Sequence, residues 1–307
     1  MDSCVRISDG KVHGLWAGGH GRDTLERVTV WRLSDGIELT FPPSLAAGVV
    51  NVTADSFYEG ARSISPEGAI EDGLRLVAKG FDLLDVGAVA ARSGPPVAVE
   101  DEAEKLAPAI AGLAERSGVP VMADTFQPEV ARAALDAGAA AINDISGGSD
   151  EMFKLVAERG CGYVLMHIEG PPRVDRAPRA YDDVVAHLKE WFEGRIERAA
   201  SAGVDAEQIA VDPGPDFDKG VDDTIELVGR ISELRDLGRP VMAAVSRKDF
   251  LGAILAGSWD QRPDADERGA ATLAATALAT AQGAEILRLH DTEALDSMRV
   301  AEAIARG

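Results

Sequence analysis

The stretch Ala46-Ala-Gly-Val-Val-Asn51-Val-Thr-Ala-Asp55-Ser-Phe-Tyr-Glu-Gly60 joins a short apolar run to a polar loop that closes at a glycine. The apolar run extends from Leu45 to Val50 and ends in the carboxamide of Asn51. Apolar runs of about four to eight residues between turn signals predict strands that are buried on both faces. The side chain of Asn51 is therefore expected to be the first on this strand that can meet a ligand.

The same pattern recurs seven more times along the chain. Each copy has a helical segment, a glycine or short turn, an apolar run and then a polar residue. The further runs are Gly80–Asp85, Gly118–Asp124, Gly138–Asn143, Gly160–His167, Gln208–Asp212, Pro240–Ser246 and Gly283–His290. Eight such units separated by helix-length segments predict an α/β fold, the (β/α)8 TIM barrel, whose active site lies at the C-terminal ends of the strands.

The polar residues at the strand ends are therefore expected to form one ring around the mouth of the barrel. The ring consists of Asn51, Asp85, Asp124, Asn143, His167, Asp212, Ser246 with Lys248, and Arg288 with His290. Its acidic and amide members suit a flat heterocycle that is rich in N–H and C=O groups. A buried carboxylate is costly unless it meets a donor-rich ligand or a cation, so several in one ring favour a ligand over a structural role.

A metal cluster is the alternative explanation for the acids, but no His/Cys pair in the sequence has zinc spacing. Opposite the acids we expect Ser246-Arg-Lys248 and Arg288-Leu-His290, which follow strands seven and eight. These two strands often build the phosphate site of such barrels. Arg288, His290 and Asn51 are expected to clamp a diphosphate together with Mg2+, which prefers oxygen ligands.

Composition limits the possible partners and the compartment. The chain has 307 residues, 46% of them hydrophobic, and a net charge of −21, which argues against nucleic acid or an anionic membrane as partner. Cys4 and Cys161 provide no disulfide framework. The sequence has no apolar stretch of about 18 residues and no signal peptide, so we expect a cytoplasmic protein.

Residues 1–44 lie outside the eightfold pattern and are expected to form an N-terminal extension to the barrel of residues 45–307. Arg27–Trp31 alternates like a strand, Ser34-Asp-Gly36 is a turn signal, and Ile37–Thr40 follows as a second strand. We expect this β-hairpin to cover the closed, N-terminal end of the barrel.

The remaining pattern predicts helices between the strands. Ser65 and Pro66 open the first as N-cap and first-turn proline. Further helices are expected at about 100–117, 128–137, 150–159, 181–203 and 264–282, with a last one at about Met298–Ala305. Two long loops, Val86–Pro96 and Glu169–Arg179, follow the second and fifth strands and are expected to be functional.

Several motifs, in the same order, resemble dihydropteroate synthase from about residue 46 to the C-terminus. They are Asn51-Val-Thr-Ala-Asp55-Ser-Phe57, Asp85-Val-Gly87, Asp124-Thr125, Ile142-Asn143-Asp144-Ile145, Met166-His167, Asp212-Pro-Gly with Phe217 and Lys219, Ser246-Arg-Lys248, and Arg288-Leu-His290-Asp291. This family, the target of sulfonamides, condenses 6-hydroxymethyl-7,8-dihydropterin diphosphate with p-aminobenzoate and releases pyrophosphate in folate biosynthesis.

The resemblance implies a role for each matched residue. The pterin would be held by Asp85, Asp124, Asn143, Asp212 and Lys248. The diphosphate with Mg2+ would be bound by Asn51, Arg288 and His290, with Asn51 as the metal ligand. The aminobenzoate would be flanked by Phe217, Ser246 and Arg92. Catalytic roles would fall to Asp85, Lys248, Arg92 and Asp55. A homodimer is also expected.

The loop after the second strand departs from the family. Ala88-Val-Ala-Ala-Arg92-Ser-Gly94 stands where the family has Gly-Glu-Ser-Thr-Arg-Pro-Gly. This change keeps an alternative open: a diverged paralogue that binds pterin without synthase activity, or that uses another amine. A third alternative is a pterin-dependent methyltransferase with a corrinoid partner. The diphosphate-binding residues argue against it, because a methyltransferase needs no such site.

Overall fold

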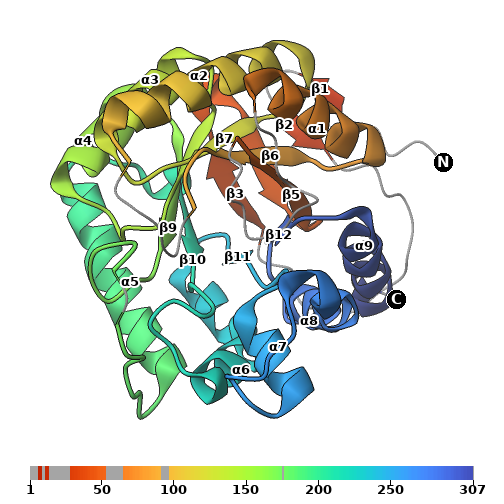
Figure 1. The fold of residues 1–307 in the computed structure, drawn as a ribbon. Coiled ribbons are helices and arrows are strands. Elements are labelled where there is room, and N and C mark those ends of the chain that lie inside the picture. The colour runs from red at the N-terminus through yellow and green to blue at the C-terminus, as the bar shows by residue number, and fades with distance from the viewer. Residues whose placement is uncertain are drawn as a thin grey trace.

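The computed structural model describes residues 6–8, 11–13, 28–52, 65–90, 97–174 and 176–306. Within these ranges, eight parallel strands form one sheet in the order β10-β9-β8-β7-β6-β5-β12-β11 (Figure 1). The strands are β5 (Leu45–Asn51), β6 (Leu83–Gly87), β7 (Val121–Asp124), β8 (Ala141–Asp144), β9 (Gly162–Met166), β10 (Ile209–Asp212), β11 (Met242–Ala243) and β12 (Ile286–Leu289). A parallel bridge between Val211 and Val241 joins β10 to β11 and closes the sheet. The predicted TIM barrel is thus confirmed.

Helices surround these strands (Figure 1). They are α1 (Pro66–Lys79), α2 (Val99–Arg116), α3 (Pro128–Asp136), α4 (Asp150–Arg159), α5 (Val184–Ser201), α6 (Val221–Gly229), α7 (Asp249–Ala256), α8 (Gly269–Ala281) and α9 (Thr292–Arg306). Ser65 caps α1 as expected, because its side chain accepts a hydrogen bond from the Gly68 amide at 3.2 Å.

The sequence pattern did not predict α6 and α7, and two helix boundaries differ most from the prediction. The last helix begins at Thr292 and not near Met298, because Asp291 accepts the Ala294 amide at 2.9 Å and starts the helix directly after the strand. The expected helix at 264–282 is split into a 3-10 turn, Ala265–Arg268, and α8. Both differences reflect caps and short turns, which hydrophobic periodicity does not register.

The expected N-terminal hairpin is present. β3 (Thr29–Arg32) and β4 (Glu38–Phe41) pair antiparallel around the turn Ser34–Gly36, with Trp31 opposite Leu39. β1 (Arg6–Ser8) and β2 (Lys11–His13) join them in a separate four-stranded sheet with the order β1-β2-β4-β3.

The hairpin packs on the N-terminal end of the barrel. Trp31, Leu33, Leu39 and Phe41 form one buried cluster with residues from all eight barrel strands. The Trp31 indole N–H donates to the Gln208 carbonyl oxygen at 2.8 Å, so the polar edge of the ring is also satisfied. The hairpin therefore seals one end of the barrel, and the polar strand ends lie at the other.

We expect Trp31→Ala to lower the free energy of unfolding by about 3–5 kcal/mol, because it leaves a cavity in a close-packed cluster. Urea denaturation measures this difference. Trp259→Ala is the matched control, because Trp259 is 41% exposed whereas Trp31 is fully buried. Equal losses in the two variants would show that the hairpin does not stabilise the barrel.

Candidate active site

The structure brings the acidic and amide residues of the expected ring together on neighbouring strands. Asp85 and Asn143, from β6 and β8, are both buried, and the Asn143 side-chain amide donates to Asp85 Oδ2 at 3.2 Å. Asp124, at the end of β7, lies between them and pairs in register with both Gly87 and Asn143. Parallel strands of a closed barrel place the residues of their C-terminal halves around one mouth, so these side chains from β6, β7 and β8 lie close together.

Arg288 lies among these acids and not opposite them. Its Nε is 2.5 Å from Asp85 Oδ2 and one terminal guanidinium nitrogen is 2.9 Å from Asp124 Oδ2. This corrects the expectation that Arg288 faces the acids across the barrel mouth. β12 pairs with β5, which pairs with β6, so a long inward side chain reaches β6 and β7. Buried carboxylates favour this contact because they need a cation.

The charges of this cluster affect one another strongly. Burial and the charge of Asp85 raise the pKa of Asp124 to about 7, against the opposing charge of Arg288. Burial lowers the pKa of Arg288, but Asp85 and Asp124 raise it more, and the net result is a pKa above its usual value. Two carboxylates thus share one guanidinium.

Two acceptor atoms in the cluster have no hydrogen-bond donor among the described residues. They are Oδ1 of Asp85 and Oδ1 of Asn143, both buried. Asp212, at the end of β10, is also buried and accepts the Gly214 amide at 2.8 Å, and burial raises the pKa of its carboxyl group. Buried acceptors without donors are rare in folded proteins, so this part of the ring suits a ligand that brings N–H groups.

His290 and Ser246 contact each other at another part of the rim. The distance between His290 Nδ1 and Ser246 Oγ is 2.9 Å. Burial and the nearby Arg288, Arg247 and Lys248 charges lower the pKa of His290 to about 3, so its imidazole is neutral at neutral pH. His290 and Arg288 contact different partners here, and their joint binding of a diphosphate stays a prediction.

Phe217 and Lys248 come together from two separate loops. The Lys248 ammonium lies 4.5 Å from the centre of the Phe217 ring. Asp216, next to Phe217, accepts the Phe250 amide in the first turn of α7 at 3.1 Å. Arg247 adopts a left-handed backbone conformation, with φ at +58°, and pairs with Asp291 at 2.7 Å. The contacts of Asp216 and Phe217 tie the loop after β10 to the loop that carries Lys248, and the Arg247 ion pair ties that loop to the start of α9.

Of three further expected site residues, Asn51, Asp55 and Arg92, the structure describes only Asn51. Asn51 is the last residue of β5 and pairs in register with Gly87 at the rim. Asp55 and Arg92 lie outside the described residues, as does most of the loop that departs from the family pattern.

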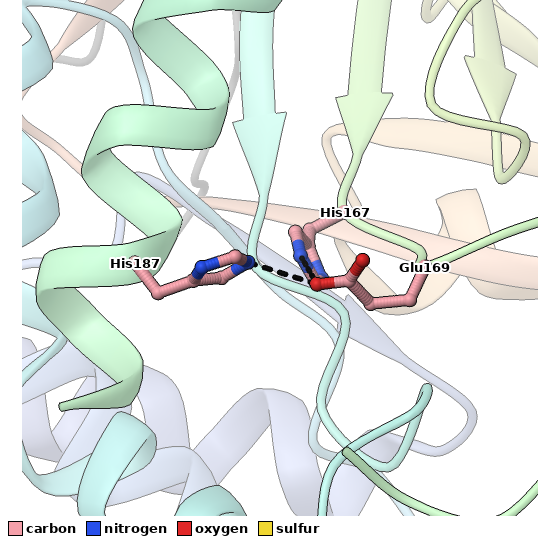
Figure 2. Close-up of side chains that lie close together, drawn as sticks. All are labelled: His167, Glu169 and His187. Carbon is pink, nitrogen blue, oxygen red and sulfur yellow. Dashed lines mark hydrogen bonds and ion pairs between the residues drawn. The ribbon is translucent and has the colours of Figure 1, made fainter. Parts of the chain in front are cut away.

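His167 is fully buried and meets residues that the sequence did not place beside it. Its Nδ1 lies 2.9 Å from the Lys219 ammonium, which also donates to the carbonyl oxygens of Gly214 and Phe217. Burial lowers the pKa of Lys219 to about 7. Glu169 and His187 lie on the other side of the His167 ring (Figure 2). His187 belongs to α5, beyond a long loop, so no local spacing indicated this contact.

Comparison with known proteins agrees with this geometry. A family model described as pterin binding enzyme matches residues 47–290. The chain belongs to this family. It is 38% identical over 275 residues to the dihydropteroate synthase of Mycobacterium leprae, with 86% of this chain and 95% of the relative covered. The resemblance inferred from the strand-end motifs is thus confirmed.

Solved structures of dihydropteroate synthase share the fold. That of Xanthomonas albilineans with 4-aminobenzoic acid is 38% identical, has a TM-score of 0.79, and covers 89% of this chain and 98% of its own. That of the same protein in complex with 7,8-dihydropteroate is 36% identical, with a TM-score of 0.74 and the same coverage. The match therefore extends over nearly the whole length of the related chains.

We expect Arg288→Met to lower the free energy of unfolding by about 3–5 kcal/mol at neutral pH, because it leaves buried carboxylates without their cation. Adding Asp85→Asn to this variant should restore part of the loss. Guanidinium denaturation of both variants measures the effect.

Arg198→Met serves as the control, because Arg198 and its partner Asp150 are largely exposed and such pairs contribute at most about 1 kcal/mol. Arg288→Met costing no more than Arg198→Met would mean that the acids do not depend on Arg288.

Proposed function

We propose that this protein is a dihydropteroate synthase, which joins 6-hydroxymethyl-7,8-dihydropterin diphosphate to p-aminobenzoate and releases pyrophosphate in folate biosynthesis. The observation that carries the proposal is the pair of buried acceptors without donors, Asp85 Oδ1 and Asn143 Oδ1. A pterin ring carries N–H groups along one edge and can supply the missing donors. Membership of the pterin binding enzyme family supports the same ligand.

Asp85, Asp124, Asn143 and Asp212 would recognise the pterin. A hydrogen bond to an ionised carboxylate is about twice as strong as one between neutral groups, so carboxylate side chains suit the N–H groups of the pterin. Asp124, whose pKa is raised to about 7, can serve as either acceptor or donor at neutral pH.

Arg288 would change partners when the substrate binds. It now compensates Asp85 and Asp124, and the pterin N–H groups would take over part of that role. The guanidinium would then be available to a diphosphate oxygen, together with the neutral imidazole of His290. This exchange would couple the binding of the pterin to that of the diphosphate. The pterin would compensate the carboxylates while the diphosphate compensates the Arg288 guanidinium, so neither charge is left without a partner.

Asn51 would hold Mg2+ at the rim. One carboxamide oxygen is a suitable protein contribution, because Mg2+ usually keeps several waters and binds substrate phosphates through few protein ligands. When bound, the ion would neutralise charge on the departing diphosphate.

Phe217, Lys248 and Ser246 would bind the p-aminobenzoate. The Phe217 ring offers a flat apolar surface, and the Lys248 ammonium 4.5 Å from its centre offers a charge to the benzoate carboxylate. The tie between the two loops through Asp216 would keep this pair in place. Arg92 and Asp55 are proposed to complete the site from loops that follow β6 and β5.

The reaction would proceed by loss of the diphosphate before attack by the amine. The bond between the pterin methylene carbon and the diphosphate oxygen breaks, and the positive charge that develops on the pterin lies beside Asp85 and Asp124. The amine nitrogen of p-aminobenzoate then forms a bond to the methylene carbon and loses a proton. Fixed charges that face a developing charge of opposite sign are an effective source of catalysis.

Steady-state release of pyrophosphate, measured with and without p-aminobenzoate, tests the proposal. We expect sustained release only with the amine, because without it the pterin cation left by diphosphate loss has no amine to attack it and turnover stops. Asp212→Asn should weaken pterin binding by about 1–3 kcal/mol, roughly 5- to 150-fold, because it presents a donor to a ring N–H. Asp150→Asn, at an exposed helix position, is the control.

Other outcomes would select the alternatives. Pterin binding without any pyrophosphate release would favour the diverged paralogue. Release with a different arylamine, but not with p-aminobenzoate, would assign another second substrate.

We also propose that the protein forms a homodimer through α8 and α9. Leu278, Val300 and Ile304 are exposed there and line one apolar groove between the two helices. Ile304→Lys combined with Val300→Lys should therefore yield a monomer in light-scattering measurements. Val28→Lys, at an exposed apolar residue outside the groove, should leave the parent's state unchanged. A parent that is monomeric, or a dimer that survives the double change, would contradict this interface.

A further inference from the structure

Three potential metal ligands converge beside the pterin site. His167 and Glu169 follow β9, and His187 projects from α5 toward them (Figure 2). His187 Nε2 lies 2.8 Å from Glu169 Oε1, and His167 Nε2 lies 3.6 Å from the same oxygen. The ligand atoms of all three residues lie within 4.8 Å of one another.

The His167 ring presents an unsatisfied nitrogen to this cluster. Lys219 occupies its Nδ1 at 2.9 Å, so Nε2 is the atom that points toward Glu169. Nε2 is buried and has no hydrogen-bond partner among the described residues, because 3.6 Å is too long for one. Because Nδ1 accepts from the Lys219 ammonium, Nε2 carries the ring proton and has no acceptor, and a cation takes this position once that proton leaves.

Aromatic side chains hold both imidazoles in place. The Trp191 ring packs edge-on against His167, with 4.8 Å between ring centres. The Tyr181 ring lies 5.1 Å from that of His187. Because these contacts restrict the rotation of both rings, the ligand atoms are already positioned before any ion binds.

We propose that His167, Glu169 and His187 bind a late first-row divalent metal ion such as Zn2+. Two imidazoles and one carboxylate are a ligand set that such ions favour, whereas Mg2+ prefers oxygen ligands. Tetrahedral coordination with bonds of about 2.0–2.1 Å requires ligand atoms roughly 3.3 Å apart. The observed separations of 2.8 and 3.6 Å bracket that value. Three protein ligands leave the fourth position to water.

The Arg179 side chain, which contacts Glu169, must move away when a metal ion binds. The Arg179 guanidinium lies 2.8 Å from Glu169 Oε1, the oxygen that both imidazoles face. The Arg179 side chain is half exposed, and exposed ion pairs are weak, so it can move into solvent at small cost. The metal also displaces a proton: His167 binds it as the Nδ1–H tautomer, Nδ1 then donates to Lys219 as a neutral amine, and the proton that Lys219 gives up is released to solvent.

The bound ion would connect the loop after β9 to α5. Glu169 and His167 begin this loop, and the Glu169 amide donates to Asp218 at 2.9 Å. The His167 amide donates to the Asp212 carbonyl oxygen at 2.9 Å, which places the cluster directly beside a proposed pterin residue. The site is separate from the Mg2+ position proposed at Asn51, because it uses other strands and nitrogen ligands.

Metal titration of the full chain, first freed of metal by a chelator, tests the proposal. We expect calorimetry with Zn2+ to show one ion per chain and Co2+ to give the visible absorption of a tetrahedral site. His187→Gln and Glu169→Gln should each weaken Zn2+ binding at least about tenfold. Arg179→Gln should strengthen it by about two- to fivefold, because it removes the competing cation.

His13→Gln combined with His20→Gln is the matched control, because it removes two imidazoles elsewhere in the chain. It should leave Zn2+ binding unchanged. A parent without Zn2+ binding or without the tetrahedral Co2+ spectrum would overturn the proposal, and so would binding that is lost in this control or unaffected by Glu169→Gln. The Co2+ measurement needs no variant, so the test holds even if a substitution prevents folding.

Discussion

The ion pairs of Arg288 with Asp85 and Asp124 are the interaction on which the site depends. A barrel of parallel strands gathers its polar strand ends at one rim, and this chain places three neighbouring acids or amides there. Several buried negative groups at this spacing would repel one another without a cation. The closed sheet supplies that cation, because β12 returns beside β5 and directs Arg288 toward them.

This compensation is incomplete, and the incompleteness suits a binding site. One guanidinium serves two carboxylates, while Asp85 Oδ1 and Asn143 Oδ1 keep no donor among the described residues. A fully paired cluster would gain little from a ligand. A partly paired one gains the missing hydrogen bonds when a donor-rich ring arrives and can release its guanidinium to an anion. Without a ligand this cluster is thus less stable than a fully paired one would be, but it binds a ligand more tightly.

The two ends of the barrel have opposite character for a physical reason. At the N-terminal end, the hairpin that carries Trp31 buries residues of every barrel strand in one apolar cluster, and this packing fixes the positions of the strands. At the other end lie the proposed site residues, and the loops there are tied by side chains, such as Asp216 to the Phe250 amide and Arg247 to Asp291. His167 is also held by side chains: Lys219 contacts one side of its ring, and Glu169 and His187 lie on the other.

The sequence by itself determined the eight strands, the hairpin and the capped first helix, and it predicted polar residues at or near the strand ends. These follow from apolar runs, turn residues and strand-end polarity, which are local signals. Only the tertiary structure decided which rim residues touch. Arg288 crosses to Asp85 from a strand 203 residues away in sequence, and His187 meets His167 from a helix beyond a long loop. Such contacts depend on how far a side chain reaches and on the compensation of buried charge. Neither of these leaves a periodic pattern in the sequence.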